Sequence, residues 1–159
     1  MEREILFRGK RKDNGEWIYG DLRHISDGHG GYILCIVDNT SGRNNDVTGI
    51  EVSPNTVGQY TGMTDKNSTK IFERDIVRYG DTIHEVVFEQ RNGTAYFGLV
   101  YSESETLPFG HYQDLRQIEV IGNIYDTPEL LKGAMKPAAT DVAQSGLAPA
   151  TENFSLQEA

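Results

Sequence analysis

The sequence predicts an all-β protein, and three features support this prediction. Short runs of β-branched and aromatic residues recur along most of the chain. Turn signals rich in Gly, Asn and Asp separate these runs at intervals of about 8 to 15 residues. A helix signature appears only once, after the last of these runs. The pattern favours a small barrel or a sandwich of antiparallel strands.

The first predicted element is a β-hairpin. Apolar runs at residues 5–7 and 17–19 flank Asn14 and Gly15. An Asn-Gly pair supplies the positive φ angles that a tight hairpin turn needs. We therefore expect two antiparallel strands near the N-terminus.

Residues 32–37 predict a buried strand, because they form a continuous apolar run. The run contains Cys35, the only cysteine of the chain. No base or cation adjoins it in sequence, so we expect a buried thiol that packs as a small hydrophobe, not a reactive one. A polar loop is predicted at residues 38–49, and a short strand at 50–52 ends before Pro54.

The central stretch, residues 56–79, has two apolar flanks around a polar loop at 65–68, which predicts a turn. Glu73 and Asp75 follow and would share one face of a strand, so repulsion between them would raise the pKa of one carboxyl. An acid/base site would also need a cleft and a third group. The simpler expectation is that both carboxylates cap the strand or pair with nearby cations, namely Lys70, Arg74 or Arg78.

A second hairpin is predicted around Asn92 and Gly93, with strands at residues 84–89 and 95–101. The last strand is expected at 117–125. Gly122 interrupts that strand, which indicates a bulge or a close backbone approach.

A short helix is predicted after this strand. Thr127 fits its N-cap, Pro128 its first position and Gly133 the position just past its end. The chain is then expected to divide into an N-terminal β portion at residues 1–54, a barrel at 55–132 and a flexible tail at 133–159.

Three blocks of sequence carry a family resemblance. The central block, Gln59 to Val77, is similar to the pattern QYTGLxDKNGxxIYEGDIV. The other blocks are Phe7-Arg8-Gly9-Lys10 with Trp17-Ile18-Tyr19-Gly20, and Val120 to Tyr125 with Pro128 to Leu131. Together they resemble the YopX family, which is found widely in phages and prophages. The chain departs from the family pattern at Ser68 and Arg74, where the pattern has Gly, and Ser68 would carry a mild cost if its φ angle is positive.

The resemblance implies an all-β protein whose C-terminal part is similar to an SH3-type barrel, with the N-terminal β portion packed against it. It also implies a phage or prophage accessory protein that acts in a bacterial cytoplasm. It supplies no catalytic residues, because no enzymatic activity is established for the family.

Charge and hydropathy argue against two classes of protein, duplex-binding proteins and membrane or secreted proteins. The net charge of −9 opposes binding to a nucleic acid duplex, which usually needs a basic face. No apolar run is long enough for a membrane span, and the N-terminus lacks the apolar core of a signal peptide, so we expect a cytoplasmic protein. One basic cluster remains as an exception, formed by Arg8, Lys10, Arg11 and Lys12.

No residue pattern predicts catalysis, a metal or a cofactor. The histidines have no spacing typical of a metal site; they are His24, His29, His84 and His111. No nucleophile elbow or phosphate-binding loop is present in the sequence. We therefore expect a protein that is not an enzyme and binds no cofactor.

Tyrosines are abundant in the predicted barrel: Tyr60, Tyr79, Tyr96, Tyr101, Tyr112 and Tyr125. They could form an aromatic binding face, for which Tyr60, Tyr79, Tyr96 and Tyr101 are the candidates. The simpler expectation is that they pack around the rim of a small core with their hydroxyl groups in water. The sequence leaves both possibilities open.

The function that the sequence favours is a non-enzymatic binding or assembly module that is homo-oligomeric and has an unidentified protein partner. The alternative is a nucleic-acid-binding accessory protein, which would use Arg8, Lys10, Arg11 and Lys12. A third possibility is an acidic decoy for the basic groove of a host protein, suggested by the net charge of −9.

Overall fold

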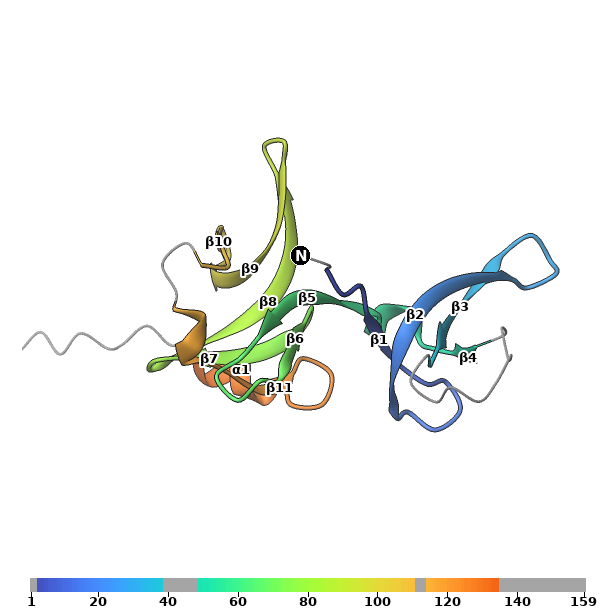
Figure 1. Cartoon of the computed structure of the whole chain (residues 1–159), viewed down its shortest axis with the longest axis horizontal. Helices are drawn as coiled ribbons and strands as arrows, with labels where there is room; N and C mark the ends of the chain where they lie inside the picture. Colours follow the sequence, from blue (N-terminus) through green and yellow to red (C-terminus); the bar gives the residue numbers. More distant parts are fainter. Residues whose placement is uncertain (1–2, 39–48, 111–113, 135–159) are drawn as a thin grey trace, which may run out of the picture.

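The computed structural model describes residues 3–38, 49–110 and 114–134. They form two antiparallel sheets. In Figure 1, β1 to β4 lie on one side, β6 to β11 lie on the other, and β5 runs between them. The six-stranded sheet has the order β4-β3-β2-β1-β5-β6, and the five-stranded sheet has the order β10-β9-β8-β7-β11. The predicted all-β class is confirmed. Both sheets are open in the described part of the chain, and neither closes into a barrel.

The six-stranded sheet contains β1 (Phe7–Lys10), β2 (Trp17–Ser26), β3 (Tyr32–Val37), β4 (Ile50–Glu51), β5 (Gly58–Thr64) and β6 (Lys70–Phe72). The five-stranded sheet contains β7 (Asp75–Tyr79), β8 (Thr82–Arg91), β9 (Thr94–Ser102), β10 (Glu105–Pro108) and β11 (Ile118–Asn123). Three short helices complete the described elements: the 3-10 helices η1 (Pro54–Thr56) and η2 (Leu115–Gln117), and the α-helix α1 (Glu129–Ala134).

Strand pairing crosses the domain boundary that we placed between residues 54 and 55. β1 pairs with β5 through Phe7 opposite Gln59 and Arg8 opposite Gly58. β5 and β6, which we assigned to the barrel, therefore extend the N-terminal sheet. The division of the chain into domains stays a prediction, and the proposed tail beyond residue 134 lies outside the described residues.

Both hairpins predicted from Asn-Gly pairs are confirmed. In the β1–β2 hairpin, Lys10 lies opposite Trp17, and of the two turn residues only Gly15 has a positive φ angle, 75°. In the β8–β9 hairpin, Arg91 pairs with Thr94, and both Asn92 (φ 51°) and Gly93 (φ 77°) are left-handed. The second turn is therefore the two-residue type that the pair favours, and the first is longer.

The main core joins the two sheets. Its fully buried side chains come from β6, β7, β8, β9 and β11: Ile71, Val77, Val86, Leu99 and Ile118. Ile71 is the contribution of the six-stranded sheet, so β6 packs its apolar face onto the five-stranded sheet. Within the N-terminal sheet, Cys35 is 3% exposed, and burial raises the pKa of its thiol. The prediction of a buried cysteine is confirmed, and the raised pKa is in line with a thiol of low reactivity.

The polar loop at residues 65–68 is a turn, as predicted, and it also connects the sheets. Asp65 Oδ1 accepts hydrogen bonds from the backbone N–H groups of Asn67 and Thr69, at 2.8 and 2.9 Å. Asp65 Oδ2 accepts from the Val120 N–H at 2.9 Å, and the Lys66 N–H donates to the Ile118 carbonyl at 2.9 Å. The loop after β5 therefore holds the edge of β11. It places β6 and β11 on opposite sides of a cleft between the two sheets.

Gly122 lies at the bulge that its position in β11 predicts. The register between β11 and β7 shifts between Val120 and Gly122. A Cβ atom at Gly122 would lie 2.0 Å from the Thr127 hydroxyl oxygen, so the backbone approaches that side chain closely. A side chain at this position would therefore force the Thr127 side chain to move.

The short helix is present, but one detail of its prediction, the position of Gly133, is wrong. The Thr127 carbonyl accepts a hydrogen bond from the Leu130 N–H at 3.1 Å, as expected of the residue that precedes the first turn, while its hydroxyl group bonds with the backbone of Asn123. Gly133 lies inside α1 (Glu129–Ala134) and not past its end. In the described part of the chain, no helix is long and apolar enough to cross a membrane.

The two departures from the family pattern both have a left-handed backbone. Ser68 has a φ angle of 66° and Arg74 has one of 67°. A side chain in this region costs about 1–2 kcal/mol, which glycine avoids. The Arg74 side chain offsets part of this cost, because its guanidinium group pairs with Glu85 at 2.7 Å.

We expect Ser68→Gly to raise the free energy of unfolding by about 0.5–1 kcal/mol, because the relief of backbone strain exceeds the added chain entropy. Urea denaturation of the purified protein measures this change. Asn92→Gly is the matched control, since asparagine tolerates the left-handed region better and should gain less. An unchanged or lowered midpoint for Ser68→Gly would show that the turn carries no such strain.

Candidate functional site

A cleft of about 490 Å³ lies between the edges of the two sheets. Three segments form its walls: the N-terminal arm, defined here as residues 3–6, strand β6 and strand β11. The side chains that matter most for its chemistry are Glu4, Leu6, Tyr19, Lys70, Phe72 and Asn123. Arg8 and Asp75 also line it and are almost completely buried, so they form its floor. The size is within the range of ligand pockets in proteins.

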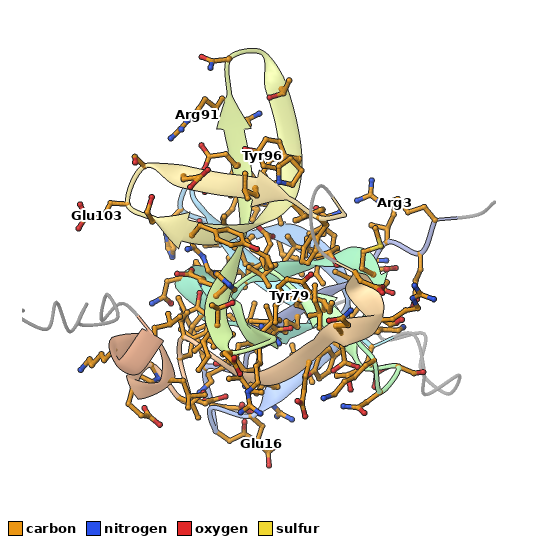
Figure 2. The ribbon with its side chains drawn as sticks, turned by 90° about the vertical axis from the view of Figure 1, so that its left-hand side faces the viewer. Arg3, Glu16, Tyr79, Arg91, Tyr96 and Glu103 are labelled. Atoms are coloured by element: carbon orange, nitrogen blue, oxygen red, sulfur yellow. The ribbon has the colours of Figure 1, made fainter. Side chains whose placement is uncertain are left out.

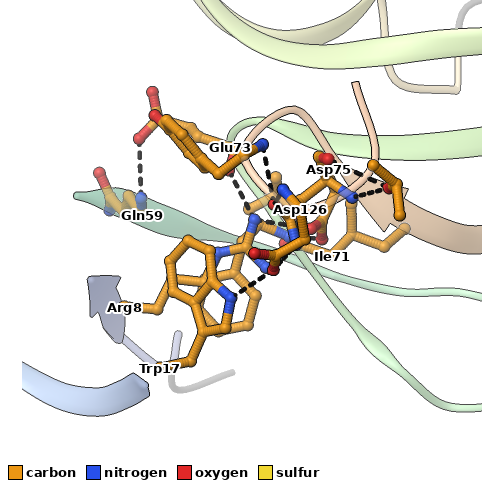
Figure 3. A network of polar contacts seen from close by, with 12 residues as sticks. Arg8, Trp17, Gln59, Ile71, Glu73, Asp75 and Asp126 are labelled. Atoms are coloured by element: carbon orange, nitrogen blue, oxygen red, sulfur yellow. Dashed lines mark hydrogen bonds and ion pairs between the residues drawn. The ribbon is translucent and has the colours of Figure 1, made fainter. Parts of the chain in front are cut away.

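A buried ion pair forms the floor of the cleft. Arg8 Nη2 lies 2.6 Å from Asp75 Oδ1, and the two side chains are 7% and 2% exposed. Arg8 Nη2 also donates to the Glu73 carbonyl at 3.1 Å, and Asp75 Oδ2 accepts from the Phe72 N–H at 2.8 Å. Because Arg8 is in β1 and Asp75 in β7, the pair fastens one sheet to the other (Figure 3).

Two aromatic rings enclose the guanidinium group. The Arg8 Cζ atom lies 4.7 Å from the ring centroid of Trp17 and 4.9 Å from that of Phe72. Such cation–π contacts favour a charged guanidinium group away from water. The Arg8 Nε–H is buried and has no hydrogen-bond acceptor among the described residues. Buried donors normally have an acceptor, so this group leaves one hydrogen bond unmade among the described residues.

The carboxylates of the central stretch have other partners than those we predicted. Asp75 pairs with Arg8, and the Glu73 side chain accepts from the Gln59 N–H at 2.7 Å. The predicted rise in the pKa of one carboxyl occurs at Asp75, but its cause is burial, which the Arg8 charge partly offsets. The nearby cations pair elsewhere: Lys70 with Glu4, Arg74 with Glu85 and Arg78 with Glu119.

A second polar cluster fastens the C-terminal turn to the N-terminal hairpin. The Asp126 carboxylate accepts hydrogen bonds from Lys10 Nζ, from Trp17 Nε1 at 2.7 Å and from Asn123 Nδ2 at 2.8 Å. The rings of Trp17 and Tyr125 lie 5.9 Å apart. The Lys10 hydrogen bond is the main reason why the pKa of Asp126 falls from 3.8 to about 2.

Asp126 should make stability depend on acidic pH. The pKa of Asp126 is lower in the folded chain than in the unfolded chain. Its contribution to the free energy of unfolding is therefore complete above pH 3.8 and is lost as pH falls towards 2. Asp126→Asn should flatten the stability profile in this range, because the asparagine does not titrate. Urea titrations at a series of pH values, followed by the fluorescence of the single tryptophan, measure the slope. Equal slopes for the two proteins would contradict this expectation.

The basic cluster predicted for nucleic acid binding is paired with carboxylates throughout. Arg8 pairs with Asp75, Lys10 with Asp126, Arg11 with Asp13, and Lys12 with Glu51. Phosphate groups would have to displace these carboxylates, so the arrangement weakens the argument for nucleic acid binding. Direct binding to DNA or RNA at low salt would test this alternative, which stays a prediction.

The candidate tyrosines do not form one face. Tyr60 is 6% exposed and packs on Phe72 in the six-stranded sheet. Tyr79 packs against the main core, and Tyr96 donates from its hydroxyl group to the Thr106 carbonyl (Figure 2). Tyr101 lies 4.2 Å from the His84 ring, at another position of the five-stranded sheet. Tyr112 lies outside the described residues.

The tyrosine that does line the cleft, Tyr19, was not among the sequence candidates. Its ring is 42% exposed and lies 5.5 Å from that of Phe72. Only its place in the N-terminal block of the family resemblance could have drawn attention to it. No group of three His, Cys, Asp or Glu side chains that could hold a metal occurs among the described residues.

A comparison with protein-family models confirms the family resemblance. The family model described as "YopX protein" matches residues 6–132. Among solved structures, the chain is similar to protein EF1440 from Enterococcus faecalis, with 23% identity and a TM-score of 0.48. That similarity covers 82% of this chain and 99% of the other. A comparison with curated proteins gives no match.

Proposed function

The chain belongs to the YopX family, and on this basis we propose that it is a non-enzymatic binding or assembly module whose ligand site is the cleft between its two sheets. The observation that carries the proposal is the cleft itself, in which an exposed aromatic ring and a charged rim lie above the buried Arg8–Asp75 pair. Binding sites commonly combine such apolar walls with a few fixed polar groups. The proposal includes a phage or prophage origin and action in the bacterial cytoplasm.

The absence of catalysis is part of the proposal. A paired-carboxylate site needs two carboxylates free to exchange protons with a substrate. Here Asp75 is held by Arg8 and the Phe72 N–H, and Glu73 is held by the Gln59 N–H. Their positions support a structural role for both groups.

We also propose that the C-terminal part is related to an SH3-type barrel. Support comes from the consecutive antiparallel strands β7, β8, β9 and β10, and from β6, which packs into the same core through Ile71. The Asp65 loop brings the edges of β6 and β11 towards one another.

Partner capture with matched variants tests the binding function. Tyr19→Ala removes an exposed wall of the cleft, whereas Tyr32→Ala removes a ring that is 73% exposed on β3 and does not line it. We expect a partner from the bacterial host to be retained by the wild type and by Tyr32→Ala, and lost by Tyr19→Ala. A partner retained equally by all three proteins would place binding elsewhere.

Assembly is tested separately by light scattering of the purified protein over a range of concentrations. The proposal expects a homo-oligomer. A monomer at high concentration would remove assembly from the proposed function and leave ligand binding in place.

A further inference from the structure

The N-terminal arm places a carboxylate and an apolar side chain in the cleft. Glu4 and Leu6 both line the cleft, whereas Ile5 between them is 63% exposed. This alternation is typical of an extended chain that presents every second side chain to one surface. Glu4 Oε1 lies 2.5 Å from Lys70 Nζ, and the Leu6 carbonyl accepts a hydrogen bond from the Tyr60 N–H at 2.8 Å.

The contact between the arm and Lys70 is weak. The side chains of Lys70 and Glu4 are 41% and 52% exposed, and ion pairs with such exposure contribute little to stability. The arm lies outside the regular strands, which begin with Phe7 in β1. The Glu4 carboxylate can therefore leave Lys70 at small cost, while the walls built by Phe72 and Val120 stay in place.

The remaining surfaces of the cleft match the chemistry that the arm presents. Lys70 supplies a cation at the rim, and its Nζ lies 5.4 Å from the ring centroid of Tyr60. Tyr19 and Phe72 supply aromatic walls. A ligand with a carboxylate and an apolar side chain has the complementary features.

We propose that the cleft binds an extended peptide segment of a protein partner in which an acidic residue and an apolar residue are separated by one residue. The acidic side chain binds Lys70, the apolar side chain lies against Tyr19 and Phe72, and Glu4 of the arm competes for Lys70. This inference rests on the proposed binding function and assigns it a class of ligand and an internal competitor.

The test uses the full-length protein and two fluorescein-labelled peptides, Ser-Glu-Ile-Leu-Ser and the same peptide with Gln in place of Glu. At low salt, the Glu peptide should bind more tightly than the Gln peptide. Glu4→Gln should tighten binding of the Glu peptide up to about fivefold, and Lys70→Gln should weaken it by a similar factor. Fluorescence anisotropy measures each dissociation constant.

Matched variants separate the proposal from a general effect of charge or stability. Lys66→Gln removes a lysine of similar exposure, 42%, which pairs with Glu119 outside the cleft, and it should leave peptide binding unchanged. Lys70→Glu should reverse the preference, so that a Lys-Ile-Leu peptide binds better than the Glu-Ile-Leu peptide. Thermal unfolding of each variant establishes that it is folded.

Three results would overturn the proposal: no peptide binding at low salt, equal binding of the Glu and Gln peptides, or no gain in Glu4→Gln. Each would leave the proposed binding function standing if the host partner is still lost in Tyr19→Ala. If Tyr19→Ala still retains the host partner while the peptides bind as expected, the result would contradict the proposed function in the cell. It would still support the proposed class of ligand.

Discussion

Arg8→Met is expected to lower the free energy of unfolding by about 3–5 kcal/mol, because it leaves the Asp75 carboxylate buried without its cation. Both groups are almost completely excluded from water, at 7% and 2% exposure of the side chains. The substitution also removes the contacts of the guanidinium group with Trp17 and Phe72. Urea denaturation followed by circular dichroism measures the loss.

Two further variants identify the cause of this loss. Arg11→Met breaks an ion pair of the same length, 2.6 Å, but that pair is exposed, so we expect a much smaller change in the free energy of unfolding than for Arg8→Met. The double variant Arg8→Met/Asp75→Asn should recover much of the stability, since it removes the unpaired charge and keeps an acceptor for the Phe72 N–H. Equal losses in Arg8→Met and Arg11→Met would refute the role of the buried pair.

Asp65→Ala is expected to lower the free energy of unfolding by about 2–4 kcal/mol, because three backbone N–H groups lose their acceptor together. Asp65 is 6% exposed, so water replaces it poorly. Asp27→Ala is the control: Asp27 accepts from the N–H groups of His29 and Gly31 in an exposed turn, where water can replace the carboxylate, so its loss should cost clearly less than that of Asp65. Similar costs for the two variants would show that the loop does not fasten β11.

The same carboxylate should contribute to acid sensitivity. Burial alone would raise the pKa of Asp65, but the backbone N–H groups of Val120, Thr69 and Asn67 outweigh that effect and lower it. A carboxyl with a lower pKa in the folded state stabilises the protein above its unfolded pKa, and this contribution is lost as pH falls. The variant Asp65→Ala should therefore be less sensitive to acid than the wild type in the same urea titrations.

Features that depend on local sequence could be predicted, and those that depend on long-range pairing could not. The Asn-Gly hairpins, the turn at residues 65–68 and the bulge at Gly122 follow from backbone preferences within a few residues. The sequence contains no signal that Arg8 lies beside Asp75, because that contact depends on the order of strands in two sheets. The predicted pairing of Asp75 with neighbouring cations failed for this reason.

The cleft was missed for a similar reason. Its walls come from the arm, β6 and β11, which are far apart in sequence and meet only after both sheets have formed. The spacing of Asp65, Asn67 and Thr69 was a usable local signal, since an aspartate often accepts from backbone groups two residues further on. The additional bond from Asp65 to Val120 spans 55 residues and had no such signal.

The bonds between Lys10 and Asp126 also affect how the chain folds during its synthesis. The two residues are 116 positions apart, so the ribosome must make most of the described chain before the N-terminal hairpin meets its carboxylate. Contacts over such distances slow folding, because the intervening chain must lose its conformational freedom first. Trp17, which donates to the same carboxylate, stays without this partner until then. The β1–β2 hairpin is therefore among the last parts of the described fold to be completed.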